Sequence, residues 1–118
     1  MKIYVYGSAE EKRRIEEVVS VLPDYAYRSF RFDGCEDYDR FIGSLCEAMP
    51  DLVIVTSDGA DGMEGVIAAK NLLPGVPVMW LSDDKGFGAQ SYRLGCAFFH
   101  PKPITSEALA QAFRKCIQ

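Results

Sequence analysis

The side chains that could do chemistry in this sequence are hydroxyls, carboxylates and one lysine, each placed at or just after a short apolar run. Ser8, preceded by Gly7, follows residues 2–6, and Thr56, Ser57 and Asp58 lie at the end of residues 51–56. Ser82, Asp83 and Asp84 follow residues 76–81, and Lys102 follows residues 96–100. A carboxylate could accept a phosphoryl group or hold Mg²⁺, and a lysine could neutralise a transferring anion. That chemistry requires the separate runs to meet in space.

The sequence gives less support to two specific activities, phosphoryl transfer to a hydroxyl group and metal binding by the pair Asp83-Asp84. A threonine or serine hydroxyl is a poor nucleophile without a neighbouring base. His100 is the only histidine, and we expect its side chain to point away from the other candidates, so neither Thr56 nor Ser57 is expected to accept a phosphoryl group. The pair Asp83-Asp84 lacks a visible third ligand and is better explained as a solvated loop. We expect no metal, no cofactor and no catalytic residue.

Glycine, proline and aspartate divide the chain into alternating strands and helices. Expected strands cover 2–6, 25–32, 51–56, 76–81 and 96–100. Expected helices begin at Ser8, cover 36–48, 63–73 and 87–94, and begin again near Thr105. Ser8 to Glu11 is a capping box, and the unbroken apolar run at 51–56 indicates a central parallel strand buried on both faces.

This alternation predicts an α/β fold. We expect a flavodoxin-like (βα)5 doubly wound parallel sheet with strand order 2-1-3-4-5, in a three-layer α/β/α arrangement, over residues 1–118 as one domain. In such sheets ligands bind beyond the carboxyl ends of the strands, which is where the candidate side chains named above fall.

The sequence also predicts which face of helix 36–48 is buried and which state the cysteines adopt. The predicted buried face of that helix consists of Tyr38, Phe41, Ile42, Leu45, Cys46 and Met49. The four cysteines have no paired or zinc-like spacing, so we expect buried free thiols.

Charge and hydropathy limit the function classes. The net charge is −4, from 17 acidic and 13 basic residues, which disfavours direct nucleic-acid binding. The basic cluster Lys12-Arg13-Arg14 is flanked by glutamates and is typical of a solvated helix face. No apolar run reaches the roughly 20 residues that span a bilayer, and the N-terminus has no signal-peptide pattern. We expect a cytoplasmic protein with no membrane contact.

The second half of the chain contains the segment Pro50-Asp51-Leu52-Val53-Ile54-Val55 and, after it, Asp61-Gly62-Met63-Glu64-Gly65. The first segment resembles the strand that carries the phosphoacceptor in the receiver domains of two-component response regulators, and the second resembles the turn that follows that strand. Pro77 to Ser82 is similar to the strand ending in their Ser/Thr switch residue. The stretch from Arg93 to Pro103 is similar to their segment around a lysine followed by proline.

The resemblance also shows what this chain lacks. Family receivers have an acidic pair where this chain has Gly7-Ser8, and a phosphoacceptor aspartate where it has Thr56. Ser82 and Lys102 match the hydroxyl residue and the lysine of the family, while Asp58 stands where the family contributes a backbone carbonyl. The resemblance therefore implies a degenerate pseudo-receiver without the phosphoacceptor, whose Lys102 could pair with one of the remaining aspartates, at position 58, 83 or 84.

Three functions remain open. The first is a receiver-like signalling module that binds a protein partner or forms a homodimer without phosphorylation, through helix 87–94, strand 96–100 and the last helix. Phe99 holds the family's switch-aromatic position there. The second is a flavodoxin-like domain that binds a small molecule or nucleotide at the strand ends, lined by residues including Gly7, Ser8, Thr56 and Ser82. The third is the regulatory domain of a longer transcription regulator.

Overall fold

The computed structural model describes residues 1–25 and 29–117 and contains five strands and five α-helices in regular alternation. In chain order these are β1 (Lys2–Tyr6), α1 (Ala9–Ser20), β2 (Arg31–Cys35), α2 (Tyr38–Ala48), β3 (Leu52–Val55), α3 (Gly59–Leu72), β4 (Val78–Ser82), α4 (Gly88–Leu94), β5 (Phe98–Pro101) and α5 (Ser106–Cys116). A short 3-10 helix, η1 (Lys85–Phe87), precedes α4.

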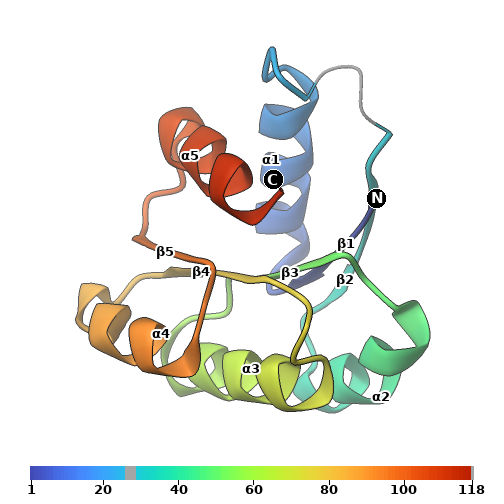
Figure 1. The fold of residues 1–118 in the computed structure, drawn as a ribbon, viewed down its shortest axis with the longest axis vertical. Coiled ribbons are helices and arrows are strands. Elements are labelled where there is room, and N and C mark those ends of the chain that lie inside the picture. The colour runs from blue at the N-terminus through green and yellow to red at the C-terminus, as the bar shows by residue number, and fades with distance from the viewer. Residues whose placement is uncertain (26–28, 118) are drawn as a thin grey trace.

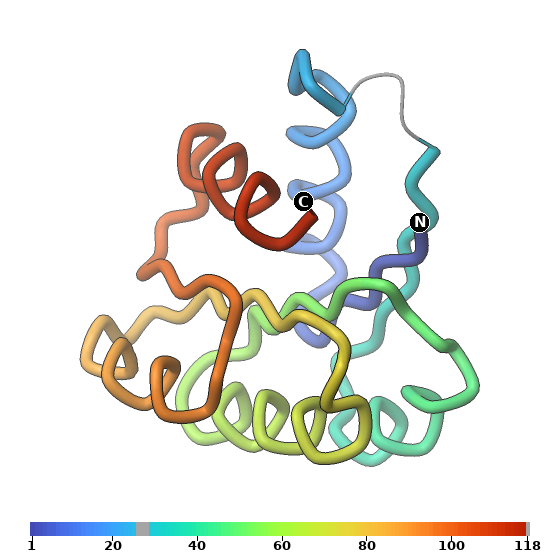
Figure 2. Tube along the Cα trace, viewed as in Figure 1, coloured from blue at the N-terminus to red at the C-terminus, as the bar shows by residue number. Residues whose placement is uncertain are grey.

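The strands form one parallel sheet with the order β2-β1-β3-β4-β5, so the predicted strand order is confirmed. Figure 1 shows the sheet nearly edge-on, with α1 and α5 on one side and α2, α3 and α4 on the other. The chain trace in Figure 2 shows the same three layers. The carboxyl ends of all five strands therefore lie along one edge of the sheet, which is the edge where the candidate residues were expected.

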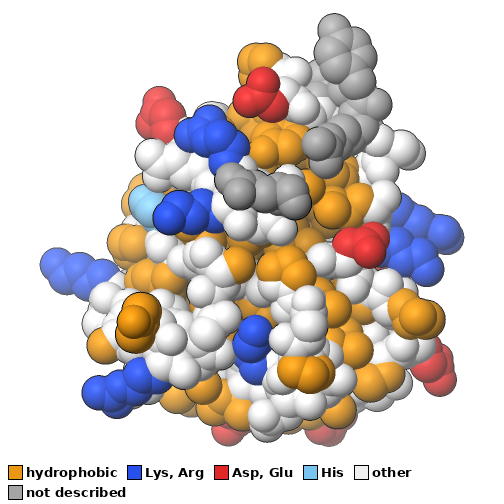
Figure 3. Space-filling model, viewed as in Figure 1, with side chains coloured by type: hydrophobic (Ala, Val, Ile, Leu, Met, Phe, Trp, Pro, Cys, Tyr) orange, Lys and Arg blue, Asp and Glu red, His pale blue; other side chains and the backbone are white. Residues whose placement is uncertain are grey.

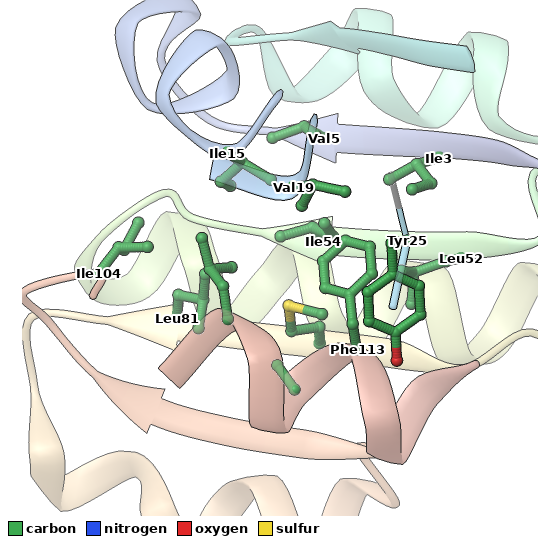
Figure 4. Close-up of a cluster of buried hydrophobic side chains, with 13 residues drawn as sticks. Ile3, Val5, Ile15, Val19, Tyr25, Leu52, Ile54, Leu81, Ile104 and Phe113 are labelled. Carbon is green, nitrogen blue, oxygen red and sulfur yellow. The ribbon is translucent and has the colours of Figure 1, made fainter. Parts of the chain in front are cut away.

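The sheet separates two apolar clusters. The cluster under α1 and α5 includes Ile15, Ile54 and Phe113, as Figure 4 shows. The cluster under α2, α3 and α4 includes Tyr6, Phe41 and Trp80. All residues of β3 and β4 are buried, which confirms that these two strands are central and explains their continuous apolar sequences.

Side chains at three helix starts satisfy backbone amides that have no partner within the helix. Ser8 Oγ accepts from Glu11 N at 3.1 Å, Asp37 Oδ2 from Arg40 N at 2.9 Å, and Thr105 Oγ1 from Ala108 N at 3.1 Å. Such caps typically contribute about 1 kcal/mol each, and they fix where these helices begin.

The second strand was predicted too early in the sequence. The expected strand 25–32 is replaced by β2 at Arg31–Cys35, and residues 26–28 of that expectation lie outside the described residues. The aromatic content that produced the expectation has another cause. Tyr25 and Phe30 pack on Phe113 of α5, at ring-centroid distances of 5.7 and 5.9 Å, rather than alternating along a strand.

Two helix predictions also need correction. Helix α3 begins at Gly59 rather than near Met63, because Asp58 is its N-cap residue and buried Gly62 lets the first turn approach the carbonyl of Ser57 without a side chain between them. On α2, Cys46 is exposed and Met49, which ends the helix in a left-handed conformation, is 73% exposed. The rest of the predicted face is confirmed: Phe41 and Leu45 are buried, and Tyr38 and Ile42 are partly buried against the same cluster.

Within the described residues, no helix is both long enough and apolar enough to cross a membrane.

Candidate functional site

Lys102 is the centre of the strand-end site. Its ammonium group donates hydrogen bonds to Glu11 Oε2 at 2.6 Å, to Asp58 Oδ1 at 2.8 Å and to the backbone oxygen of Thr56 at 2.8 Å. A lysine ammonium has three N–H donors, so these three acceptors use its full donor capacity. The side chain is only 17% exposed, and the two carboxylates neutralise its charge with one negative charge to spare.

The carboxylates are themselves held by the ends of other elements. Glu11 Oε1 accepts from Ser8 Oγ at 3.1 Å, which ties the cap of α1 to the lysine. Asp58 Oδ1 also accepts from the backbone amide of Asp83 at 3.2 Å. The site therefore joins the segments that follow β1, β3, β4 and β5 through one ionic network.

The network stabilises the charged form of the lysine. Burial of the ammonium lowers the pKa of Lys102, but the hydrogen bonds and negative charges of Asp58 and Glu11 act in the opposite direction and prevail, so the pKa lies above its ordinary value. Lys102 is accordingly a fully protonated cation at neutral pH.

Glu11 is the site residue that the sequence analysis missed as a partner of Lys102. Its position three residues after Ser8 identified it as part of a capping box, and the cap does form through its backbone amide. Its side chain, however, does not complete the box and reaches across to Lys102. Only the packing of α1 beside the carboxyl end of β5 shows this second role. Asp58 is one of the three partners considered for Lys102, and in the described part of the chain neither Asp83 nor Asp84 forms an ion pair with it.

Gly7, just after β1, lies so close to Thr56, just after β3, that the site has no room for a side chain at position 7. A Cβ atom at position 7 would overlap Thr56 Oγ1, and would lie only 3.0 Å from Thr56 Cβ and 3.3 Å from Ser57 N. Thr56 is fully buried, and its hydroxyl has no hydrogen-bond partner among the described residues. A side chain at position 7 and Thr56 in its present position therefore exclude one another.

Ser82 and the acidic loop after it serve a local turn. Ser82 is fully buried at the end of β4, and its Oγ accepts from Asp84 N at 3.1 Å. Asp84 in turn caps η1 by accepting from Gly86 N at 2.8 Å. Within residues 1–25 and 29–117 no group of three or more histidine, cysteine, aspartate or glutamate side chains is arranged to hold a metal ion.

Phe99 lies apart from the Lys102 network. Its ring meets the indole of Trp80 edge-on at 5.5 Å, and Trp80 stacks on Phe87 at 5.1 Å. Phe99 is therefore packed against the core on the α4 side of the sheet. His100 is on the other face, where its ring stacks on Phe98 at 6.2 Å and its Nδ1 lies 2.6 Å from the oxygen of Pro101.

The structure therefore brings together Ser8, Thr56, Asp58 and Lys102 of the predicted set and adds Glu11. Gly7 and Ser82 adjoin this group at neighbouring strand ends, whereas Phe99 does not.

The chain was compared with protein-family models, with curated protein sequences and with solved structures. No protein-family model and no curated protein sequence matches the chain. Several solved structures match it over nearly its whole length. An orphan response regulator of H. pylori, HP1043, has a TM-score of 0.77 at 16% identity, over 98% of this chain and 96% of that chain.

Two further structures agree. The chemotaxis response regulator CheY4 of Vibrio cholerae has a TM-score of 0.74 at 14% identity, over 98% of this chain and 97% of that one. A protein described as a CpaE2 pilus assembly protein from Sinorhizobium meliloti has a TM-score of 0.75 at 18% identity, over 99% of this chain and all of that one. Identities this low establish shared architecture and nothing more. The chain has the fold of response-regulator receiver domains.

Proposed function

We propose that this chain is a receiver-like signalling module that works through protein–protein contact and does not need phosphorylation. The observation that carries the proposal is the saturated ammonium of Lys102. All three of its N–H groups are bonded to groups of the chain itself, at 2.6 to 2.8 Å. An incoming phosphoryl group would have to displace one of these three acceptors to be bound by this lysine.

The strand ends around Lys102 support the same proposal. Phosphoryl transfer to a receiver needs a carboxylate nucleophile and a divalent cation held by further carboxylates. Thr56 supplies a buried hydroxyl in place of the nucleophile, and Gly7 cannot be exchanged for an acid while Thr56 keeps its position. The two carboxylates nearest the site are engaged by the lysine. We therefore regard the domain as non-enzymatic.

The small-molecule alternative finds less support. A ligand at the strand ends would need accessible lining groups, but Gly7, Thr56 and Ser82 are all buried. Several structures with this fold belong to response regulators by name, and one of them is called a LuxR family DNA-binding response regulator, from Silicibacter pomeroyi. We extend that signalling role to this chain, with a protein partner or a second copy bound at the face formed by α4, β5 and α5.

A phosphorylation assay tests the proposal. The protein is incubated with acetyl phosphate and Mg²⁺, or with beryllofluoride and Mg²⁺, and followed by intact mass and by amide chemical shifts. A receiver that has the acidic pair and the phosphoacceptor aspartate is treated in parallel as the positive control. We expect no adduct and no Mg²⁺-dependent shifts at the strand ends. A stoichiometric acyl phosphate, labile to hydroxylamine, would contradict the proposal.

A further inference from the structure

The charges of this acidic chain are unevenly divided along it. Residues 85–118 contain five lysines and arginines and one glutamate, a net charge of +4. The first 84 residues contain eight basic and sixteen acidic residues, a net charge of −8. Residues 85–118 supply η1, α4, β5 and α5, the elements at the β5 edge of the sheet, so the elements at this edge carry a net positive charge although the whole chain is acidic.

Four of the five cations in this part are available to a partner. Lys102 is engaged in its own ionic network, but Lys85, Arg93, Arg114 and Lys115 are exposed. None of these four forms an ion pair with another described residue. Figure 3 shows Lys and Arg side chains gathered over α4 and α5 on one flank of the molecule. The charge is therefore displayed to solvent and not neutralised within the fold.

A groove with one aromatic lining residue lies beside two of these cations. It has a volume of about 670 Å³ and is lined by Phe98, Gln111, Arg114 and Lys115. Phe98 is half-buried on β5, which is an edge strand of the sheet. On α4, Tyr92 is 88% exposed. Aromatic side chains flanked by arginine are typical of the residues that contribute most to binding at protein interfaces.

We infer that this surface, defined by Lys85, Tyr92, Arg93, Phe98, Arg114 and Lys115, binds an acidic segment of a different protein. The carboxylates of that segment pair with the cations, and one of its apolar side chains enters the groove beside Phe98. The inference rests on the proposed function and adds the chemistry of the partner. A basic surface on an acidic protein also steers acidic partners toward it before contact.

Charge also distinguishes this partner from a second copy of the chain. A symmetric dimer through the same surface would bring two copies of one basic surface together, and like charges in an interface are unfavourable. A head-to-tail contact with the acidic part of a second copy would build a closed ring or an open filament of many copies instead of a pair. A separate acidic partner satisfies the surface without either cost.

Peptide titration of the full chain tests the inference. The probes are a short synthetic peptide that combines glutamates with one phenylalanine, and its counterpart with lysines in place of the glutamates. Backbone amide shifts locate binding and give the Kd. We expect the acidic peptide alone to bind, with shifts in α4, β5 and α5, and with an affinity that falls as the salt concentration rises from roughly 0.05 to 0.5 M.

Charge-reversal variants make the test specific. Arg114→Glu combined with Lys115→Glu should raise the Kd about tenfold, because two attractive pairs become repulsive. Arg13→Glu combined with Arg31→Glu is the matched control, since it makes the same change in net charge at exposed positions on α1 and β2. The control should change the Kd less than about twofold.

Four outcomes would overturn the inference: no binding of the acidic peptide, equal binding of the basic one, equal loss in the control variant, or shifts that map to another face. Two further results would replace the partner. These are self-association of the wild type that is abolished by Arg114→Glu with Lys115→Glu, and tighter binding of duplex DNA than of the peptide at the same surface. An acyl phosphate in the separate acetyl phosphate assay would instead refute the proposed function, so the two failures are distinguishable.

Discussion

The close contact between Gly7 and Thr56 leads to a measurable coupling between these two positions. Alanine at position 7 places a methyl group where Thr56 Oγ1 now lies, with Ser57 N only 3.3 Å away. Both neighbours directly follow β3, and Thr56 is fully buried, so little room exists for adjustment. Overpacking of a buried site typically costs 1–3 kcal/mol, and we expect Gly7→Ala to destabilise the fold by about 2 kcal/mol.

The second change is made at Thr56. Thr56→Ala removes a methyl group and a hydroxyl that has no described partner, which should cost about 1 kcal/mol by itself. In its presence the Cβ atom at position 7 no longer meets an oxygen, although the contacts of 3.0 and 3.3 Å remain tight. We therefore expect Gly7→Ala to cost about 1 kcal/mol less in the Thr56→Ala background than in the wild type.

The assay is urea denaturation of the wild type, the two single variants and the double variant, combined as a double-mutant cycle. Thermal melting gives a parallel reading, in which Gly7→Ala should lower Tm by roughly 5 to 12 °C for a domain of this size. The control is Gly43→Ala on α2, where an added Cβ has no atom within 4 Å. It should stabilise the protein by about 0.5–1 kcal/mol through helix propensity. Strict additivity of the two site substitutions, or a neutral Gly7→Ala, would refute the steric reasoning.

Three other predictions concern the ionic network and the thiols. Lys102→Met should lower stability by about 1 kcal/mol at neutral pH, a modest value because Asp58 is half-exposed. Since folding raises the pKa of Lys102, its contribution is complete below the unfolded value near 10.5 and is lost as the pH rises through the folded pKa. Alkaline denaturation of Lys102→Met should therefore lack that component, and an unchanged alkaline profile would contradict it. Glu11→Gln should cost a similar amount in the wild type and less in Lys102→Met, as measured by urea denaturation, and equal losses in both backgrounds would show that the pair is not coupled. Iodoacetamide at pH 8 should label exposed Cys46 first and Cys96 slowly, since burial raises the pKa of Cys96 to about 11; Cys46→Ser should remove the fast phase in a mass-resolved time course.

The sequence by itself determined the order of elements and the layout of the sheet. Continuous apolar runs at β3 and β4 occur because both faces of these strands are covered by helices. Such a run can be recognised from a few consecutive residues of the sequence. The alternation of such runs with amphipathic helices left one favoured strand order. The position of the strand-end residues followed from the same rule, so Thr56, Asp58 and Lys102 could be selected in advance as neighbours.

Only the tertiary structure decided which groups meet at the site. Glu11 reaches Lys102 across 91 positions of sequence because α1 and α5 pack on the same face of the sheet, and nothing in the local pattern of a capping box indicates that contact. The mutual exclusion of a side chain at position 7 and Thr56 likewise depends on the register between β1 and β3.

The same distinction explains the misplaced β2. Aromatic residues around positions 25 to 30 have the composition of a strand, yet Tyr25 and Phe30 contact a helix that follows them by more than 70 residues. The apolar character of a side chain indicates that it will be buried, but packing between distant segments determines which residues bury it. The basic surface over α4 and α5 has the opposite origin: its charges are visible in the sequence, and folding determines that they face solvent together.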